Sequence, residues 1–322
     1  INYNMSNFTT ENNSIIKSFG GLKEQLKPSW RGILKPENKL IPLTIEKTHI
    51  LKKDTYEAES LLNNYGYTIK DSNIMDIGCY AGIQCYAAAE LGAKSAKGID
   101  IPEYFTLQTT GKNINNNDDV EEHSNLYTKK RKEASTAFSP EILSKISFED
   151  LSVHNLTEKE KYDIIFSWET LEHIIDNKKG FENIYNALVP GGVSLHTYNP
   201  FFSITGGHSL CTTNSPWGHA RMTVNDFEKY TKENLPQDVP DDFLEISLNF
   251  FTQNLNRLTQ HDLKQILVDS GFTILEFIPH VNIQLLKNIN NEIFYQIKQL
   301  YPTITITDLI CDYVTILIKK PE

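Results

Sequence analysis

The sequence predicts an α/β protein built on a doubly wound, Rossmann-like sheet. The stretch Asn73–Glu103 has the pattern of a strand, a glycine turn, a helix over Ile83–Leu91 and a second strand over Ala96–Ile101. Parallel neighbours in such a sheet need a helical crossover of this kind. The strongest strand pattern of the chain follows at Lys161–Glu169. The 322 residues allow one large domain with insertions or two domains.

The glycine turn lies where a doubly wound sheet binds its ligands, at the carboxyl end of a strand. Dinucleotide binding there requires G-x-G-x-x-G. Here Tyr80 stands at the second glycine position, and Gly82 follows Gly78 by four residues. Asp76 also places a carboxylate beside the turn, which suits a cationic ligand better than a pyrophosphate. A nucleotide-dependent oxidoreductase or epimerase is therefore disfavoured.

A second acid follows the second strand of this unit. Asp100 lies 24 residues after Asp76, about the ~20-residue spacing at which a carboxylate binds a ribose diol. The segments D-I-G-C-Y-A-G (residues 76–82) and G-I-D-I (residues 98–101) together resemble the first two motifs of class I S-adenosylmethionine-dependent methyltransferases.

The resemblance implies a set of cofactor contacts. The turn, with Asp76, Gly78, Cys79, Tyr80 and Gly82, would hold the methionine part of S-adenosyl-L-methionine. Asp100 and Ile101 would hold the ribose. An acid after the third strand would receive the adenine amino group, and the candidates are Asp150, followed by Leu151, or its neighbour Glu149. Ser167, Trp168 and Glu169, after the fourth strand, would face cofactor and substrate.

The resemblance also implies a seven-stranded sheet that ends with an antiparallel strand. A Pro-Gly-Gly turn (residues 190–192) precedes a fifth strand at Val193–Tyr198, as in the family. Two strands, Phe272–Ile278 and Tyr313–Ile318, would close the sheet around a helical insertion. The expected organisation is an N-terminal helical extension or lid (1–71), a cofactor-binding core (72–200), a substrate loop and cap insertion (201–257) and the C-terminal part of the core sheet (258–322).

Residues 201–223 are the least generic segment, rich in aromatic residues and glycine, where a doubly wound fold places ligand loops. His208 and His219 are the candidate general bases, and Arg221 could bind an acidic or hydroxylated acceptor. His173, in an L-E-H-I segment, is the next candidate, whereas His196 is expected inside a strand. A metal site at His208, Cys211 and His219 is disfavoured because the second ligand pair is missing.

Composition excludes several partners. A formal net charge of −10 and a pI near 5.4 argue against nucleic acid. No run approaches the ~18 apolar residues that span a membrane. Four cysteines without a C-x-x-C pair suggest a reducing cytoplasm rather than a disulfide framework. The basic run Lys129–Lys132 is expected on a solvated face, and Asn115–Glu122 in an exposed insertion.

The sequence therefore predicts an enzyme that transfers a methyl group from S-adenosylmethionine to a small-molecule acceptor, most simply the hydroxyl of a sugar or similar polar metabolite. Because the sulfonium already activates the methyl group, the protein must mainly align the reactants and remove a proton. The alternative is a catalytically silent subunit that binds the cofactor. The oligomeric state does not follow from the sequence.

Overall fold

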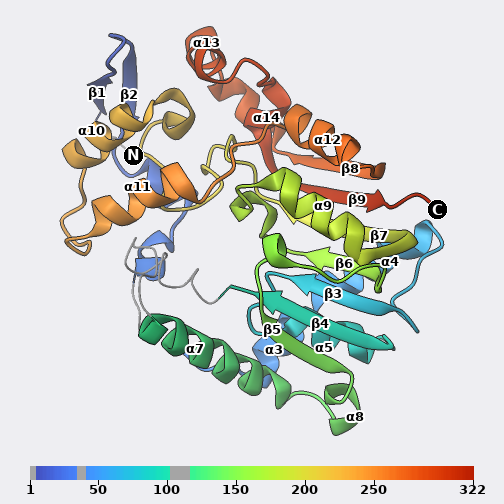
Figure 1. Cartoon of the computed structure of the whole chain (residues 1–322). Helices are drawn as coiled ribbons and strands as arrows, with labels where there is room; N and C mark the ends of the chain where they lie inside the picture. The colour runs from blue at the N-terminus through green and yellow to red at the C-terminus, as the bar shows by residue number, and fades with distance from the viewer. Residues whose placement is uncertain (1–4, 35–40, 102–116) are drawn as a thin grey trace.

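The computed structural model describes residues 5–34, 41–101 and 117–322. A seven-stranded sheet with the order β5-β4-β3-β6-β7-β9-β8 forms its centre (Figure 1). The strands are β3 (Asn73–Ile77), β4 (Ser95–Asp100), β5 (Ile146–Asp150), β6 (Tyr162–Ser167), β7 (Leu188–Tyr198), β8 (Thr273–Val281) and β9 (Cys311–Lys319). The first five are parallel, and β9 pairs antiparallel with both β7 and β8. The predicted fold is confirmed.

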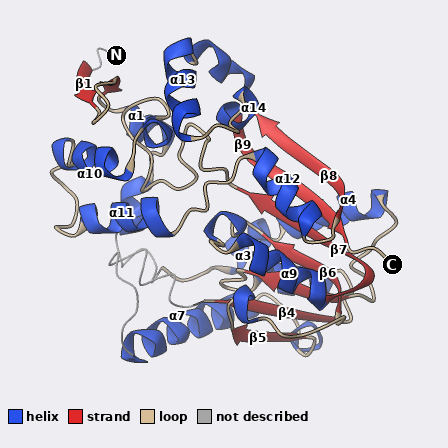
Figure 2. Ribbon diagram, turned by 45° about the horizontal axis from the view of Figure 1, so that its top comes forward, coloured by secondary structure: helices blue, strands red, loops and turns tan. Residues whose placement is uncertain are grey.

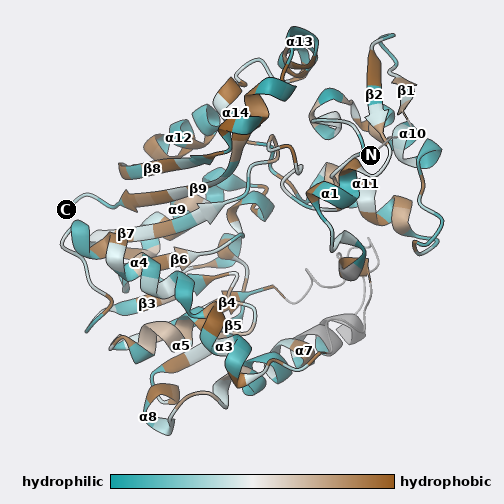
Figure 3. Cartoon of the chain, turned by 180° about the vertical axis from the view of Figure 1, so that it is seen from behind, coloured by the Kyte–Doolittle hydropathy of each residue, from teal (hydrophilic) through white to brown (hydrophobic). Residues whose placement is uncertain are grey.

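Helices cover both faces of this sheet. They are α3 (Ile45–Leu51), α4 (Lys53–Asn64), α5 (Ile83–Glu90), α7 (Asn117–Ser135), α8 (Pro140–Leu143), α9 (Asn177–Ala187) and α12 (Gln260–Asp269). Ile184 of α9 and Leu263 of α12 belong to the core cluster on one face, and Leu62 of α4 and Ala88 of α5 to the cluster on the other. Figure 2 shows α9 and α12 in front of the strands, and Figure 3 shows α4 and α5 from behind.

A cap lies beyond the carboxyl ends of the parallel strands (Figure 1). Its elements are β1 (Met5–Thr9), β2 (Ile15–Phe19), α1 (Leu22–Leu26), η1 (Trp30–Leu34), η4 (Gly218–Arg221), α10 (Val224–Glu233), α11 (Phe243–Gln253), η5 (Ile283–Asn288), α13 (Asn291–Leu300) and α14 (Ile306–Ile310). Trp30, Phe201, Phe250 and Ile297 share its hydrophobic core. Three segments distant in sequence thus form one cap that covers the carboxyl ends of the parallel strands.

Sheet topology places a crevice at that edge. The strand order reverses between β3 and β6, because β3 pairs with β4 on one side and with β6 on the other. Such a switch point leaves room at the carboxyl ends for a ligand. The loops after β3, β6 and β7 meet there, together with the short helices η2 (Val153–Asn155) and η3 (Leu171–His173).

Two local predictions differ from the structure, in whole or in part. The Pro-Gly-Gly run is no turn before β7 but part of it, because α9 ends at Ala187 and Leu188 already pairs with Tyr162; Gly191, with φ 77°, accompanies a register shift. The expected exposed insertion is helical from Asn117, while Asn115 and Asn116 lie outside the described residues.

The basic run is solvated only in part, because Lys130 and Arg131 are buried whereas Lys129 and Lys132 are exposed. Trp30 is also buried, inside a 3-10 helix. Within the ranges that the structure describes, no helix has the length and apolar character needed to cross a membrane.

Candidate active site

The turn after β3 has a left-handed backbone at three positions. The φ angles of Gly78, Tyr80 and Gly82 are 77°, 45° and 76°. The amide of Gly78 donates to the Ile99 carbonyl at 2.9 Å, and that of Gly82 to the Cys79 carbonyl at 2.7 Å. Tyr80, which stands where the resembled motif has a glycine, therefore keeps the turn in the left-handed region at a cost in backbone strain.

Both glycines also allow close packing. A Cβ at Gly78 would lie 2.1 Å from the Thr170 hydroxyl, and a Cβ at Gly82 would lie 2.2 Å from the Phe148 ring. Thr170 belongs to the loop after β6, and Phe148 to β5. The glycines thus allow the turn to pack against the loop after β6 on one side and, beyond β4, against the Phe148 ring of β5 on the other.

Asp76 is an unpaired acid at the centre of this crevice. Its carboxylate is 1% exposed, and neither oxygen has a hydrogen-bond partner among the described residues. Burial, reinforced by the nearby Asp100, raises its pKa well above the usual range. A buried carboxylate without a partner is costly, so this position calls for a cationic ligand or a proton.

Asp100 closes the other side of the turn. Its Oδ2 accepts from the Tyr80 amide and its Oδ1 from the Ile101 amide, both at 2.7 Å. The Tyr127 hydroxyl lies 3.5 Å from Oδ1. Burial raises the pKa of Asp100 to about 6, although these donors oppose the shift. Ile101 is partly exposed beside it.

Asp150, at the end of β5, engages α7. Its Oδ1 lies 3.4 Å from Nη1 of Arg131, and its Oδ2 accepts from the Ser124 hydroxyl. The amide of Leu151 donates to the Asp100 carbonyl, which ties the two strand ends together. Glu149 instead pairs with Lys97 at 2.6 Å, so Asp150 remains the acid nearer the crevice.

Sequence reasoning missed Tyr127 and Arg131. Both lie on α7, whose residues 124, 127 and 131 have the spacing of one helix face. The Arg131 guanidinium is 4.7 Å from the Phe148 ring and donates to the Tyr80 carbonyl at 3.1 Å. A helix over residues 117–135 predicts that these side chains share one face. It does not predict that this face packs against the ends of β4 and β5.

Ser167 is committed to a buried hydrogen-bond chain. Its hydroxyl lies 2.6 Å from Nδ1 of His196, and Nε2 of His196 lies 2.6 Å from the Ser194 hydroxyl, which donates to the Ile165 carbonyl. The Ser194 oxygen therefore accepts from Nε2, and Nδ1 accepts from Ser167. Burial lowers the pKa of His196 to about 3, which is consistent with a neutral structural histidine. Trp168 stacks on Phe166.

A cavity of about 350 Å³, here called the His173 cavity, opens between the strand ends and the cap. Its lining residues are Lys27, Ser29, Trp30, Ile33, Glu169, Glu172, His173, Asn199, Gly207, His208 and Ser209. Glu169, directly after the loop's Trp168, has a φ of 48°. Strained non-glycine residues concentrate at functional sites, and this one lies beside two histidines.

The hydrogen bonds of the two histidines assign their tautomers. Nδ1 of His173 lies 2.8 Å from the Asn254 carbonyl, which only accepts, so Nδ1 carries the proton and Nε2 the lone pair. Nδ1 of His208 accepts from the Leu210 amide at 3.2 Å, so its proton is on Nε2. The rings meet edge to face at 6.0 Å, and His208 stacks on Phe250. Nε2 of His173 is therefore a proton acceptor, and the Nε2–H group of His208 is a hydrogen-bond donor.

Glu172 lies beside His173. Its Oε1 is 4.0 Å from Nε2 of His173 and accepts from the Asn199 side-chain amide at 2.9 Å. Burial raises the pKa of Glu172 to about 8. Burial also lowers the pKa of His173 to about 4, so its imidazole is neutral near pH 7.

The other predicted catalytic residues lie elsewhere. His219 is fully buried in the cap core, edge-on to Phe201, and burial lowers its pKa to about 3. Arg221 donates to Gln296 at 2.7 Å and lines a separate cavity between the N-terminal hairpin and α13. The structure therefore brings His208 and His173 together but not His219 and Arg221.

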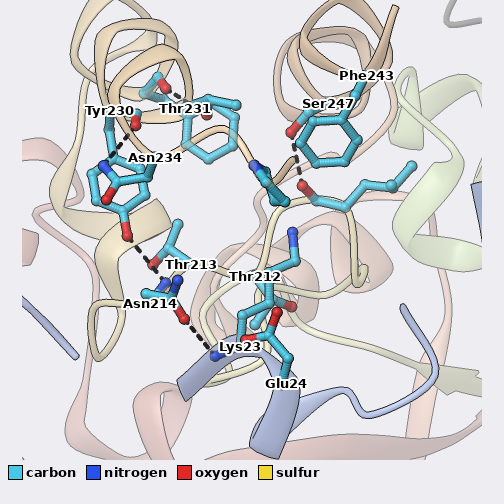
Figure 4. Close-up of a pocket in the computed structure, with 13 residues that line it drawn as sticks. Lys23, Glu24, Thr212, Thr213, Asn214, Tyr230, Thr231, Asn234, Phe243 and Ser247 are labelled. Carbon is cyan, nitrogen blue, oxygen red and sulfur yellow. Dashed lines mark hydrogen bonds between the residues drawn. The ribbon is translucent and has the colours of Figure 1, made fainter. Parts of the chain in front are cut away.

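A third, much smaller cavity lies inside the cap. Figure 4 shows Lys23, Asn214 and Tyr230 on its wall, and its volume is about 40 Å³. Nζ of Lys23 lies 4.2 Å from the Trp30 ring, the same ring that borders the His173 cavity. This space suits water rather than a substrate. Among the described residues, no three His, Cys, Asp or Glu side chains converge as metal ligands, and all four cysteines are buried thiols.

Comparison with known proteins identifies the fold's family. The family model described as a methyltransferase domain matches residues 50–276. The ribosomal protein L11 methyltransferase of Haemophilus influenzae is 36% identical over 76 residues, and that of Pseudomonas fluorescens (strain Pf0-1) 31% over 109 residues. These matches cover 23% and 33% of this chain and only 25% and 36% of the relatives. An S-adenosylmethionine-dependent methyltransferase from Mesorhizobium loti matches 81% of this chain and 96% of its own at 16% identity, with a TM-score of 0.46.

Proposed function

We propose that this chain, which belongs to the methyltransferase-domain family, takes S-adenosylmethionine as its methyl donor and methylates a hydroxyl of a sugar or similar polar small molecule bound in the His173 cavity. The observation that carries this proposal is the position of His173. Its Nε2 lone pair is fixed by the Asn254 carbonyl in a cavity at the carboxyl ends of β6 and β7.

The residues around the glycine turn fit the cofactor. Asp76 offers a buried, unpaired carboxylate for a cationic group, and S-adenosylmethionine carries both an ammonium and a sulfonium. Gly78 and Gly82 keep the backbone free of side chains beside it. Asp100 lies at the next strand end for the ribose, and Asp150 one strand further for the adenine. When bound, the cofactor supplies an electrophilic methyl group on sulfur.

The His173 cavity fits a small polar acceptor. Its volume lies in the usual range for small-molecule sites, roughly 300–1,000 Å³. Carboxyl, amide, hydroxyl and imidazole groups line it, with one aromatic ring from Trp30. Such a wall can bind several hydroxyl groups and fix their orientation. Because the curated relatives match only part of the chain, their ribosomal-protein acceptor is an alternative outcome of the test below.

Methyl transfer to a hydroxyl needs a proton acceptor. Nε2 of His173 would take the acceptor's hydroxyl proton, which would leave on the acceptor oxygen the electron pair that methyl transfer requires. His208, with Nε2–H, donates a hydrogen bond to the acceptor. The Glu172 carboxyl lies 4.0 Å from Nε2, and its raised pKa of about 8 leaves it largely uncharged near neutral pH, so it borders the base without supplying a countercharge. Asn254 holds the ring in this orientation.

The test measures transfer of a labelled methyl group to a panel of hydroxylated small molecules and, separately, to ribosomal protein. His173→Gln should lose roughly 10²–10⁴-fold in turnover with an unchanged Kd for the cofactor, the usual worth of a general base. His208→Gln should mainly raise KM, and His261→Gln, at an exposed position of α12, serves as the matched control.

Full turnover in His173→Gln with a large loss in His208→Gln would move the base to His208. Labelled ribosomal protein without labelled small molecules would replace the proposed acceptor. Cofactor binding without transfer to anything in the panel would favour a silent subunit.

A further inference from the structure

The buried guanidinium of Arg221 is paired only with neutral groups among the described residues. Arg221 is 7% exposed. Its Nε donates to Oε1 of Gln296 at 2.7 Å, and its Nη1 to the Pro216 carbonyl at 3.3 Å. Burial lowers the pKa of Arg221 to about 10, although Glu292 opposes the shift, so the side chain is charged near neutral pH. A buried charge without a counterion is costly, and this position therefore calls for an anion.

Arg221 borders a cavity of about 370 Å³, here called the Arg221 cavity, whose size is in the usual range for small-molecule sites. A guanidinium has five N–H groups. Two of them donate to Gln296 and Pro216, and the other three have no partner among the residues that the structure describes. Side chains with hydroxyl and amide groups complete the wall, among them Ser14 between β1 and β2 and Gln299 of α13.

Two carboxylates also border the Arg221 cavity and limit the charge of a ligand. Asp226 is buried, and its Oδ2 accepts from the amide and the hydroxyl of Thr223, the residue that caps α10. Glu292 is exposed and is linked to Arg221 through Gln296, whose Nε2 lies 3.4 Å from Oε1 of Glu292. Both acids repel added negative charge, so a singly charged carboxylate fits this cavity better than a doubly charged phosphate.

We propose that the Arg221 cavity is a second ligand site, separate from the His173 cavity, which binds the carboxylate of a small polar organic acid. Arg221 donates to both carboxylate oxygens, in the paired geometry that a guanidinium and a carboxylate favour. Hydroxyl and amide groups of the hairpin and of α13 bind the other polar groups of the acid. Because the wall combines residues 10–14, 221–226 and 292–300, a bound acid joins three segments of the cap and stabilises the folded chain.

The experiment measures the melting temperature of the full chain at increasing concentrations of lactate, gluconate or glutamate, at constant ionic strength. Lactamide is the neutral analogue of lactate, and inorganic phosphate is the doubly charged anion. The carboxylates should raise the melting temperature, phosphate should act only at higher concentrations, and lactamide should have no effect. The proposal is wrong if no carboxylate of this panel acts or if lactamide acts equally, and stronger binding of phosphate would overturn the carboxylate assignment.

Three variants test whether the acids bind in this cavity. Arg221→Gln should weaken their binding at least tenfold, the scale of a lost hydrogen bond to a charged group. Gln299→Glu and Lys298→Gln form a matched pair, because each lowers the net charge by one at an exposed position of α13. Of these two residues, only Gln299 lines the cavity. Gln299→Glu should therefore weaken binding several-fold, whereas Lys298→Gln should bind as tightly as wild type.

Unchanged affinity in Arg221→Gln would overturn the proposal. Equal weakening in Gln299→Glu and Lys298→Gln would do the same, because the acids would then respond to overall charge and not to this cavity. If Arg221→Gln does not fold, these two exposed substitutions still decide the question. Lys27→Gln removes the cation that borders the His173 cavity and should retain binding. Loss of binding in that variant would place the acid in the His173 cavity instead and overturn the second site.

Discussion

Gly82→Ala should destabilise the protein through two separate effects. The residue has a φ of 76°, and a left-handed backbone costs a residue with a Cβ about 1–2 kcal/mol. The new Cβ would also lie 2.2 Å from the Phe148 ring. That ring cannot withdraw easily, because the Arg131 guanidinium covers it at 4.7 Å and the Tyr86 ring packs on it at 5.8 Å. Overpacking of this kind typically costs about 1–3 kcal/mol, for a total of about 2–5 kcal/mol.

Gly66→Ala is the control for backbone strain alone. Gly66 has a φ of 79°, and no atom of the described chain lies within 4 Å of its added Cβ. Urea denaturation of both variants should show a loss about 1–3 kcal/mol larger at position 82. Trimming the ring in a Gly82→Ala/Phe148→Leu double variant should recover part of that difference. Affinity for S-adenosylhomocysteine should fall at position 82 but not at 66.

Equal losses of stability at the two positions would refute this reasoning, because they would show that the turn after β3 tolerates a side chain against Phe148. A larger loss without any change in cofactor affinity would instead separate the turn from the cofactor site.

Two further predictions concern buried acids. Asp76→Asn should stabilise the ligand-free protein by about 1–3 kcal/mol near pH 8, because a buried unpaired carboxylate is costlier than a neutral amide. The same change should lower cofactor affinity about tenfold or more. Urea denaturation measures the first effect and calorimetry the second, and unchanged affinity would show that Asp76 does not meet the cofactor's positive charge. Glu172 has a folded-state pKa of about 8 against an ordinary value of 4.5, so the folded protein retains this proton while the unfolded chain releases it. The contribution of Glu172 to stability is therefore greatest below pH 4.5 and decreases by up to about 1.4 kcal/mol per pH unit as the pH rises to 8. Denaturation between pH 5 and 8 should show a flatter profile for Glu172→Gln than for wild type, and parallel profiles would contradict the assigned burial effect.

Much of the proposed cofactor site could be predicted from local sequence. The spacing of Asp76, Gly78 and Gly82 requires a strand that ends in a left-handed turn, and Asp100 is placed by the strand that follows one helix later. These positions lie within about 25 residues of one another, so the crossover geometry of one βαβ unit is enough to bring them together. The bounds of α12 are equally local, since Thr259 is its N-cap and Gly271, with a left-handed backbone, follows its end.

The sequence could not show which histidine of the proposed acceptor site is the base. Three histidines were candidates, and what separates them is burial and hydrogen bonding with residues far along the chain. His173 takes its tautomer from Asn254, 81 residues away, and Asn199 and Trp30 complete its cavity from two other segments. His219 has a sequence setting much like that of His208, yet one packs inside the cap core and the other faces the cavity.

The sequence by itself determined the sheet, its turn chemistry and the acids at successive strand ends, because each depends on backbone conformation and side-chain period within a short stretch. Only the tertiary structure decided how α7 lies, which places Tyr127 and Arg131 on those acids. It also decided that His173 and His208, but not His219, line the same cavity. Contacts between distant segments are set by the packing of whole elements, and no local pattern of residues contains that information.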